Sequence, residues 1–472
     1  MRWFALDRGS SLPLTRQIYG ELSSQILGGE LRAGERLPST REAAGELGVS
    51  RNVVMEAYEQ LAAEGFLLGI SGAGTYVAEG SRLGFPSRRP PGPGAPAEPE
   101  PSRAPGREEG SRACAIDFRL GRPALDLVPY RAWARLECEA RLGAPVEALG
   151  GAEPEGQPEL REALQAYLWR RRGIDCRPEQ IAISSGALQG LSTLASLVLE
   201  PGSPVLFEDP GHVLAREAFA ARGAAILPIP VDEEGLRTEL LPRDSRPALA
   251  FVTPSHQFPL GGCLSVQRRV ALVEWAREAG CLLVEDDYES EFRYDVGPVS
   301  SLQRLDPENV AYVGTFSKVF FPAIRLGYLV LPERLVEGYL SRRRLADRYG
   351  APPPQLAMAR FIGEGRLDKH IARMRRIYRG RRDALVGALE AAFPGRARIL
   401  GRATGLHVAV RFEGLAFGPP LIESIRRAGV ILHPVEDYAL VKGSHSGTVA
   451  MGYSHLEVEE IERGVAILAG IL

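Results

Sequence analysis

Three polar side chains in the second half of the sequence follow strand-like apolar runs. Lys318 comes directly after VAYVGTFS, Asp286 ends the run CLLVED, and Tyr288 follows two residues later. A lysine at the end of a buried strand lies in partly apolar surroundings, which lower its pKa and favour the free amine that forms a Schiff base with a carbonyl. Taken alone, each position also fits a solvated loop tip.

A turn of small residues before a helix is a fourth feature of this kind. The run IAISS is followed by Gly186, Ala187 and Leu188 and then by a helical pattern. Backbone N–H groups at a helix N-terminus form an anion site. Ser317 and Arg325 can complete such a site for a phosphate group.

Pyridoxal phosphate is the cofactor that requires this set of groups. It needs a lysine for the covalent link, a carboxylate beside the ring nitrogen, an anion site and a flat side chain over the ring. The features above occur at the carboxyl ends of predicted strands, where open α/β sheets bind ligands. The sequence therefore predicts a pyridoxal phosphate site around Lys318, in which a carboxylate at the end of the run CLLVEDD can pair with the ring nitrogen and Tyr288 can hydrogen-bond the ring phenolate.

The elements that position these groups are apolar strands that alternate with helices. The predicted strands include QIAISS, PVLFEDP, ALAFVTP, CLLVEDD, VAYVGTFS and RLGYLVLP, and helices such as ALQGLSTLASLVLE lie between some of them. Continuous apolar strands of this kind are typical of a mostly parallel sheet that is buried on both faces. The main domain is therefore expected to be of the α/β class.

The first 80 residues predict three helices and a hairpin. Apolar residues recur every four positions over residues 14–26, and the run PSTRE supplies a Ser–Glu capping box for a short second helix. Ser50 can cap a third helix. The runs FLLGI and TYV flank SGAG, a pattern that indicates two strands and a tight wing.

Three helices and a wing match a winged helix-turn-helix, in which the second helix of the motif enters the major groove by its N-terminal residues. These residues are Ser50, Arg51, Asn52 and Val53. Arg can pair with guanine and Asn with adenine through two hydrogen bonds each. Arg41, at the start of the preceding helix, can reach a phosphate or a base.

A small helical domain that contacts other proteins is the alternative interpretation. Residues 1–80 hold seven Arg, no Lys and ten Asp or Glu, whereas DNA-binding modules usually carry a basic surface. Several of the acids, such as Glu56, Glu59 and Glu64, fall away from the predicted docking edge. Gly72 at the wing tip lets the backbone approach DNA closely.

The two halves are separated by a segment that has almost nothing to bury. Residues 81–112 are rich in Pro, Gly, Ser and charge, so they cannot form a packed core, and their prolines favour extended conformations. We therefore expect a DNA-binding domain over residues 1–80, a flexible linker over 81–112 and an effector domain over 113–472. A long surface loop is the alternative for the middle segment.

Length and composition agree with a multidomain protein of the cytoplasm. The chain has 472 residues, a net charge of −2 and five scattered cysteines that form no C-x-x-C pair. The cysteines argue against a disulfide framework or a structural zinc site and fit a reducing compartment, so no metal site is predicted. The sequence also lacks the apolar core of a signal peptide and a run long enough to span a bilayer, so no membrane association is expected.

The N-terminal motifs GxLxxGxxLPSxR, LGVSRNxV and GxGTxV closely resemble a GntR-type winged helix. The resemblance implies binding to double-stranded operator DNA. The family's DNA-contacting positions fall on Arg41, Arg51, Asn52, Val53, Ser71 and Gly72. Val53 departs from the Thr that is usual in the family.

The second half resembles fold-type I aminotransferases, and the whole chain resembles the MocR (GabR-like) subfamily of GntR regulators. The matching motifs are SSGALQG, FEDPGH, TPSHQFPLGG, EDDYESEFRY and GTFSKVFFPAIRLGY. The resemblance implies that Lys318 carries the cofactor, with Asp286 on the ring nitrogen and Tyr288 on the ring hydroxyl. It also implies that His212 stacks on the ring, where the family usually has Tyr. It places the phosphate near Gly186, Ala187, Leu188, Ser317 and Arg325, although Leu188 stands where Gln is common.

One departure bears on function. Aminotransferases usually carry an Arg near the C-terminus that grips the substrate carboxylate, and the segment GTVAMGYSHL has Ala450 or Met451 there. Loss of this bidentate clamp disfavours transamination of ordinary amino acids. The expected function is therefore a pyridoxal phosphate-dependent transcription regulator that senses the cofactor itself or an amine. The resemblance further implies a homodimer and control of vitamin B6 or amino-compound metabolism.

Two alternatives remain open at this point. The Lys–Asp–Tyr set permits an active aminotransferase with an accessory DNA-binding domain, which steady production of a keto acid from an amino donor would reveal. The cofactor site can also be vestigial, a reading that the full set of site residues disfavours.

Overall fold

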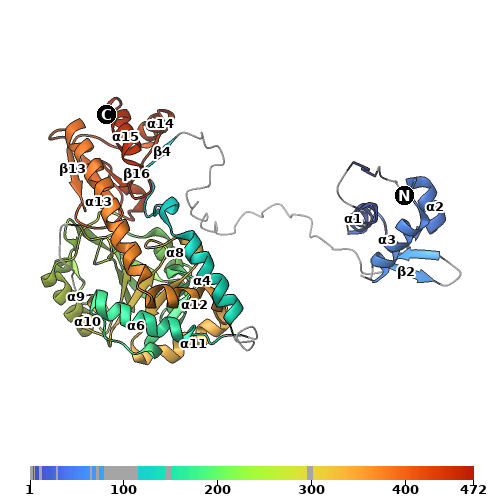
Figure 1. The fold of residues 1–472 in the computed structure, drawn as a ribbon, viewed down its shortest axis with the longest axis horizontal. Coiled ribbons are helices and arrows are strands. Elements are labelled where there is room, and N and C mark those ends of the chain that lie inside the picture. Colours follow the sequence, from blue (N-terminus) through green and yellow to red (C-terminus); the bar gives the residue numbers. More distant parts are fainter. Residues whose placement is uncertain are drawn as a thin grey trace. The chain divides into compact units, whose positions relative to one another are not determined.

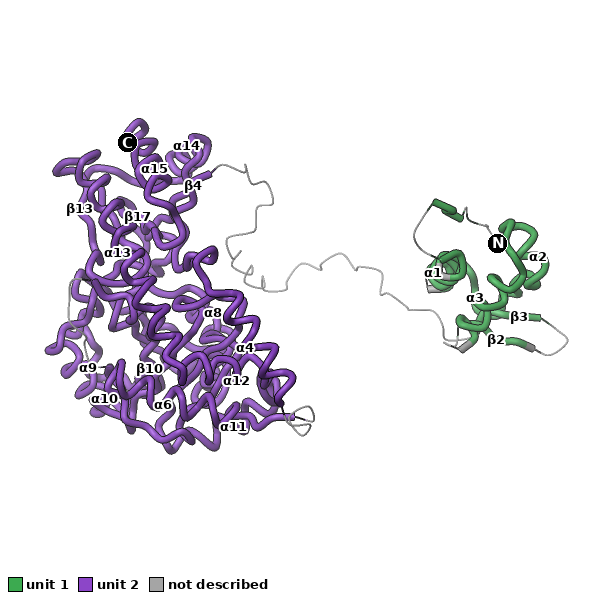
Figure 2. The backbone as a smooth tube through the Cα atoms, viewed as in Figure 1, with its two compact units in different colours: residues 1–107 green, residues 108–472 purple. Residues whose placement is uncertain are grey.

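The computed structural model describes residues 4, 6–9, 13–27, 30–63, 66–70, 74–78, 115–144, 151–294 and 301–472. The chain divides into two compact units, residues 1–107 and 108–472, which Figure 2 colours separately. The expected linker, residues 81–112, lies outside the described residues, so its flexibility and the domain boundaries remain predictions.

Unit 1 (residues 1–107) contains three helices and a small antiparallel sheet. The helices are α1 (Leu14–Leu27), α2 (Thr40–Leu47) and α3 (Arg51–Ala63). Strands β1 (Arg36–Leu37), β2 (Leu67–Ile70) and β3 (Gly74–Val77) pair in the order β1-β3-β2. The helices and the sheet enclose one apolar core, to which the period-four residues Ile18 and Leu22 contribute with no exposed surface.

The second helix of unit 1 begins and ends as its sequence predicts. The Ser39 side chain accepts from the backbone N–H of Glu42, and the Glu42 carboxylate accepts from the backbone N–H of Ser39. The helix ends at Gly48, whose φ of 65° is a left-handed conformation that glycine adopts without strain. The predicted capping box is confirmed, and it fixes the residue at which α2 begins.

Unit 2 (residues 108–472) is built on an eight-stranded sheet, called here the large sheet, which lies at the centre of this unit in Figure 1. Its strand order is β5-β12-β11-β10-β9-β6-β7-β8. Strands β11, β10, β9, β6 and β7 are mutually parallel, whereas β12 and β8 run antiparallel to their neighbours. The bounds of the strands are β5 (Ile181–Ser184), β6 (Pro204–Asp209), β7 (Ala225–Asp232), β8 (Gly235–Leu236), β9 (Leu249–Val252), β10 (Leu282–Asp287), β11 (Val310–Thr315) and β12 (Gly327–Val330).

Helices cover both faces of the large sheet. One face packs on α7 (Ala187–Val198), α8 (Val213–Ala220) and α11 (Glu333–Ala346). The opposite face packs on α4 (Tyr130–Gly143), α6 (Pro158–Arg172), α9 (Val266–Ala279) and α12 (Pro352–Gly363). The predicted α/β class, with a mostly parallel sheet buried on both faces, is confirmed.

The C-terminal part of unit 2 adds a second, antiparallel sheet, called here the C-terminal sheet. It contains β13 (Ala397–Leu400), β14 (His407–Phe412), β17 (Thr448–Gly452) and β16 (His433–Pro434) in that order. Helices α13 (Arg366–Ala392), α14 (Pro419–Arg427) and α15 (Val458–Ala469) surround it in Figure 1, while β4 (Ile116–Asp117) pairs with β15 (Val430–Ile431). The small helix α10 (Leu302–Leu305) completes the α-helices of the described ranges. None of the helices in the described ranges is both long and apolar enough to cross a membrane.

Candidate functional site

The carboxyl ends of three strands bring the predicted cofactor residues to one edge of the large sheet. Strand β10 pairs in parallel with β11, so Asp286 near its end lies beside the strand that leads to Lys318. Strand β5 runs in the same direction as β11, because β12 between them is antiparallel to both, and it leads to Gly186. Parallel strands thus gather these residues although up to 132 positions separate them in the sequence.

Lys318 is half-buried, and its amine is held by the backbone. The Nζ atom donates a hydrogen bond of 2.6 Å to the carbonyl oxygen of Gly121. Burial lowers the pKa of Lys318, and the carboxylates of Glu289 and Asp286 oppose that shift. The chain has only three lysines, and the other two, Lys369 and Lys442, are exposed. Lys318 is therefore the lysine whose surroundings favour a reactive, uncharged amine.

Asp286 is a buried carboxylate with one oxygen that no described residue satisfies. Its side chain is 5% exposed, and Oδ1 has no hydrogen-bond partner in the described part of the chain. Burial, aided by the neighbouring charge of Asp287, raises the pKa of Asp286 to about 7, while Lys318 acts in the opposite direction. A protonated ring nitrogen placed against Oδ1 would supply the missing donor and the compensating charge.

The adjacent carboxylate, Asp287, is bonded to side chains of the protein interior. Its Oδ2 atom lies 2.7 Å from Nε of Arg172 and accepts hydrogen bonds from Tyr312 at 2.6 Å and Ser290 at 2.8 Å. These partners distinguish the two neighbouring aspartates: Oδ2 of Asp287 is bonded to Arg172, Tyr312 and Ser290, whereas Asp286 interacts electrostatically with Lys318. The sequence run EDD does not by itself show which aspartate serves the cofactor site and which one pairs with the protein interior. It also does not predict the ion pair between Asp287 and Arg172.

Tyr288 and His212 complete the wall of the site. The Tyr288 hydroxyl donates to the backbone oxygen of His256 at 2.8 Å, so it must turn away from that carbonyl to donate to a ring oxygen. His212 caps α8 by accepting from the backbone N–H of Ala215 at 3.1 Å. Burial and the charge of Lys318 lower the pKa of His212 to about 4, so its ring is neutral at physiological pH. A neutral, flat imidazole suits stacking on an aromatic ring.

The expected phosphate cradle lies at the N-terminus of α7. Gly186 precedes the helix with a φ of 99°, and a Cβ there would lie 3.3 Å from the guanidinium nitrogens of Arg325. Arg325 also donates to the backbone oxygen of Ser185, which fixes the guanidinium beside the helix start. Glycine therefore leaves room for an anion between the helix N–H groups and a cation.

The other predicted phosphate residues lie at the same place with different exposure. Ser317 is half-buried, and its backbone N–H and hydroxyl both contact the hydroxyl oxygen of Thr315, each at 3.1 Å. Ala187 opens α7, whereas Leu188 is 38% exposed in its first turn. A leucine side chain brings no hydrogen-bond donor to a phosphate, so only the backbone of Leu188 can contribute.

These residues fit pyridoxal phosphate on four counts. A lysine amine with a lowered pKa, a buried carboxylate with an unsatisfied oxygen, a neutral aromatic wall and a helix N-terminus beside an arginine lie around one edge of the sheet. Charge and hydrogen bonding would both be balanced by the bound cofactor. The fit rests on the chemistry of the donor set and on the unsatisfied oxygen of Asp286.

The segment that usually supplies a carboxylate-binding arginine is apolar in this chain. Ala450 and Met451 lie on β17 in the C-terminal sheet and have no exposed surface. Ala450 pairs with Ala409 and with His433, so the strand packs tightly at this position. A guanidinium cannot occupy this position without a large rearrangement.

Unit 1 presents the predicted DNA-contacting residues at the start of two helices. Arg41, Ser50, Arg51 and Asn52 are exposed, whereas Val53 is half-buried against the core of the unit. The Nε atom of Arg51 donates to the hydroxyl of Thr40 at 3.2 Å, which links the N-terminus of α3 to that of α2. Ser71 and Gly72 at the wing tip lie outside the described residues.

Comparisons with known proteins match both units. Residues 14–77 match the bacterial regulatory proteins of the gntR family, and residues 117–465 match the class I and II aminotransferases. The chain is 33% identical to the probable rhizopine catabolism regulatory protein MocR of Rhizobium meliloti, over 98% of this chain and 94% of that protein. It is 32% identical to the pyridoxine biosynthesis regulator PdxR of Corynebacterium glutamicum, over 82% of this chain and 81% of that protein.

A solved structure supports the cofactor site by its likeness in fold. The α-aminoadipate aminotransferase LysN of Thermus thermophilus was determined with a phosphopyridoxyl-leucine adduct. It matches with a TM-score of 0.70 and 28% identity, over 76% of this chain and 92% of that chain. Class I and II aminotransferases depend on pyridoxal phosphate, so unit 2 is similar to a family that uses the predicted cofactor.

Proposed function

The chain belongs to the MocR-type branch of the GntR family of transcription regulators, and on that basis we propose that it is a regulator whose cofactor-binding unit senses an amine or pyridoxal phosphate itself. Operator DNA is bound by unit 1, and the signal is read by unit 2. The observation that carries this proposal is the unsatisfied Oδ1 of Asp286 at the same edge of the sheet as the amine of Lys318.

In unit 1, the exposed start of α3 is the part that recognises the base sequence of the DNA. Arg51 and Asn52 are exposed there and can form two hydrogen bonds each with base edges in the major groove. Arg41 stands at the start of α2, where a guanidinium can hold a phosphate. Val53 is half-buried and contributes an apolar contact at most. Ser71 and Gly72 are proposed as wing contacts on the resemblance alone.

In unit 2, each site residue acts on one part of the bound cofactor. Lys318 provides the amine for the covalent link, Asp286 holds the proton of the ring nitrogen, and His212 covers the ring. Tyr288 is proposed as the donor to the ring hydroxyl. When bound, pyridoxal phosphate supplies an electrophilic carbon that captures amines from solution. The protein contributes binding and orientation, and the helix N-terminus of α7 with Arg325 is proposed to bind the phosphate.

The buried apolar surface at Ala450 and Met451 bears on the effector. An amino acid held through its carboxylate needs a cation at this place, and the strand supplies two uncharged, fully buried side chains. We therefore favour pyridoxal phosphate itself, or an amine that is not held through an α-carboxylate, as the signal. This ligand class favours control of vitamin B6 or amino-compound metabolism. Two relatives are named as regulators of pyridoxine biosynthesis and of rhizopine catabolism.

Two copies of the chain are proposed to act together. Fold-type I domains are similar in forming dimers, and a dimer presents two winged helices to two operator half-sites. Light scattering on the full chain tests this point. A regulator that binds the chromosome acts in the cytoplasm of a bacterium, and we propose that location.

The test of the proposed function measures operator binding with and without the cofactor. Operator fragments are selected by the wild-type chain from a random-sequence library, and binding is compared with pyridoxal phosphate, with added amines and with neither. We expect the cofactor or an amine to change affinity or the footprint, and Lys318→Ala to abolish that change while DNA binding persists. Equal binding under all conditions contradicts effector sensing.

The same protein distinguishes the alternative of an active aminotransferase. With amino donors and a keto-acid acceptor present in excess, a regulator yields at most about one keto product per site, because the clamp for an α-carboxylate is missing. Steady turnover that Lys318→Ala removes supports the enzymatic alternative.

A further inference from the structure

Three buried atoms with no hydrogen-bond partner converge beside the cofactor site. They are Nε2 of His256, Oε1 of Glu289 and Nδ1 of His407, and none is satisfied by another described residue. The three side chains are at most 1% exposed. A buried polar atom that is left unsatisfied destabilises the fold, so three in one place indicate a missing ligand.

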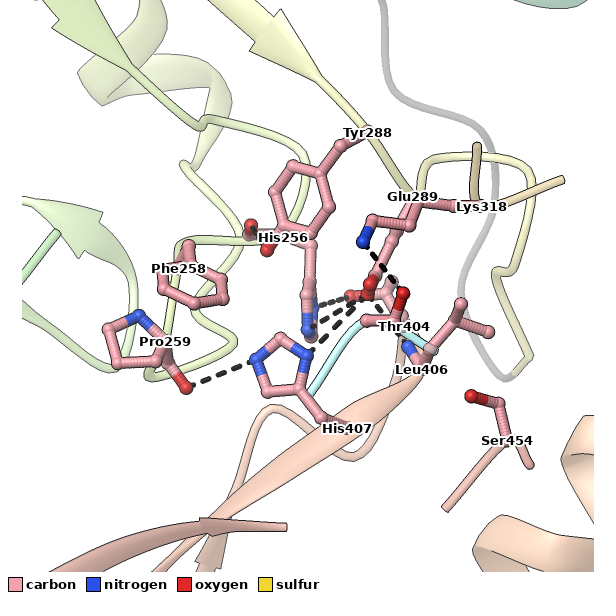
Figure 3. Close-up of polar contacts among 12 residues, drawn as sticks. His256, Phe258, Pro259, Tyr288, Glu289, Lys318, Thr404, Leu406, His407 and Ser454 are labelled. Carbon is pink, nitrogen blue, oxygen red and sulfur yellow. Dashed lines mark hydrogen bonds and ion pairs between the residues drawn. The ribbon is translucent and has the colours of Figure 1, made fainter. Parts of the chain in front are cut away.

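The three side chains come from three separate segments of unit 2. His256 lies in the loop after β9, Glu289 lies two residues past the end of β10, next to Tyr288, and His407 is the first residue of β14. Figure 3 shows the two imidazoles turned toward the carboxylate. The cluster therefore joins the large sheet to the C-terminal sheet.

The spacing is too long for direct hydrogen bonds and suits ligands that share an ion. Oε2 of Glu289 lies 3.6 Å from Nδ1 of His407 and 3.8 Å from Nε2 of His256. An N–H···O hydrogen bond spans about 2.7–3.2 Å. Ligands that each lie about 2.0–2.1 Å from a tetrahedral zinc ion are roughly 3.4 Å apart. Ligand atoms of all three residues lie within 4.8 Å of one another, so small side-chain rotations are enough to bind one ion.

The outer nitrogens of both histidines are held in the manner of metal ligands. Nε2 of His407 lies 3.1 Å from the backbone oxygen of Pro259, which can only accept a hydrogen bond, so this nitrogen carries the proton. Nδ1 of His407 then presents its lone pair to the carboxylate unless the ring is doubly protonated. Nδ1 of His256 lies 2.7 Å from the hydroxyl of Thr404, which leaves Nε2 to face the cluster.

A glycine keeps space open at the cluster. Gly405 has a φ of 83°, and a Cβ at this position would lie 2.3 Å from Nε2 of His256. Any other residue would therefore fill the space beside the imidazole nitrogen. Leu406 donates its backbone N–H to Oε2 of Glu289 at 2.8 Å, which orients the carboxylate while Oε1 stays open.

We propose that His256, Glu289 and His407 bind one divalent transition-metal ion of the zinc class, which ties the C-terminal sheet to the loop that carries Tyr288. Two imidazoles and a carboxylate are the ligands such ions prefer, and a water molecule can complete the coordination. The site does not depend on the proposed function, because none of its three ligands belongs to the set that holds the cofactor.

The test loads the full-length chain with metal after removal of pyridoxal phosphate, because the cofactor itself chelates metals. The protein is treated with a chelator, incubated with Zn²⁺ or Co²⁺ and desalted. Wild type is expected to retain one Zn²⁺ per chain by mass spectrometry and to melt at a higher temperature when loaded. Bound Co²⁺ is expected to give the intense visible bands of a low-coordinate site.

Three variants localise the ion. His407→Gln and Glu289→Gln are expected to lose the retained zinc, whereas His370→Gln, at a buried histidine of α13 outside the cluster, is expected to keep it. Retention of no more zinc by wild type than by His407→Gln overturns the proposal, and a protonated His407 or a buried water then balances Glu289. If a variant fails to fold, the cobalt spectrum of wild type decides, because a spectrum like that of aqueous Co²⁺ also overturns the proposal.

Discussion

The amine of Lys318 is bonded to the backbone oxygen of Gly121 at 2.6 Å. Gly121 lies in the segment after β4, 197 positions before the lysine. Its φ is +62°, and a Cβ there would lie 2.5 Å from Nζ. The N-terminal end of unit 2 thus holds the proposed cofactor lysine in place, and glycine is required both for the backbone conformation and for the closeness of the contact.

Replacement of this glycine should weaken cofactor binding. In Gly121→Ala the added methyl group collides with Nζ and displaces the amine from the site. We expect the affinity for pyridoxal phosphate to fall at least about tenfold, or roughly 1.4 kcal/mol. The left-handed backbone should cost a further ~1 kcal/mol of folding stability. Absorbance titration with the cofactor measures the first effect, and chemical unfolding measures the second.

Gly202→Ala is the matched control for this experiment. Gly202 also has a positive φ, +86°, but a Cβ there meets no atom within 4 Å. The control should lose a similar amount of stability and bind the cofactor like wild type. An equal fall in cofactor affinity in the two variants contradicts a specific role for the Gly121 contact.

Asp286→Asn should separate binding from stability. The variant removes the negative charge proposed to hold the protonated ring nitrogen, so we expect affinity for pyridoxal phosphate to fall by about 10- to 100-fold. Asn keeps the size of the side chain, and the cofactor-free protein should fold normally. Fluorescence or absorbance titration checks the affinity, and wild-type affinity in the variant would exclude the assigned role.

The same variant makes a prediction about pH. Burial raises the pKa of Asp286 from 3.8 to about 7, so the folded protein binds a proton that the unfolded chain releases. This carboxyl therefore lowers stability as pH rises from about 4 to about 7, and the loss is complete above that range. Without cofactor, the difference in unfolding free energy between Asp286→Asn and wild type should grow in favour of the variant by about 1–3 kcal/mol as the pH rises from about 5 to about 8. A pH-independent difference in unfolding free energy contradicts the raised pKa.

Two residues at the start of α3 should carry most of the base recognition. Arg51→Ala and Asn52→Ala each remove a side chain that can form two hydrogen bonds with a base, so each should cost about 1–3 kcal/mol of operator affinity. Each should also relax the sequence preference at one position. Gel shifts with the selected operator and with single-base variants of it measure both effects.

Arg32→Ala is a charge-matched control in the same unit. Arg32 is exposed like Arg51, but it precedes β1 and lies outside the helix-turn-helix. Its loss should leave the sequence preference unchanged. If Arg32→Ala and Arg51→Ala weaken binding equally at every operator variant, α3 does not read the bases.

Most of the large sheet could be predicted from the sequence. The six predicted runs form β5, β6, β9, β10, β11 and β12, because fully buried strands read as continuous apolar segments. Strand β7 was not predicted, since it contains Pro228 and Pro230. It tolerates them because only the two-residue strand β8 pairs on its outer side, so few of its N–H groups are needed there.

The candidate cofactor site was predictable to the extent that its residues follow strands. Lys318, Asp286 and Gly186 lie at one sheet edge by topology alone. The Gly121 contact, the Arg172–Asp287 pair and the His256–Glu289–His407 cluster were not predictable, because each joins segments that are far apart in the sequence. The sequence spacing of these residues does not indicate the contacts, since they depend on how separate elements of unit 2 pack together.

The most direct test of the central claim is the visible absorption spectrum of the chain mixed with pyridoxal phosphate and desalted. Because the chain has three lysines, wild type can be compared with Lys318→Ala and with Lys369→Ala/Lys442→Ala, which keeps only the proposed site. We predict a visible band that survives desalting in wild type and in the double variant and is absent from Lys318→Ala. A band that persists in Lys318→Ala, or is missing from all three proteins, contradicts a covalent cofactor site at Lys318.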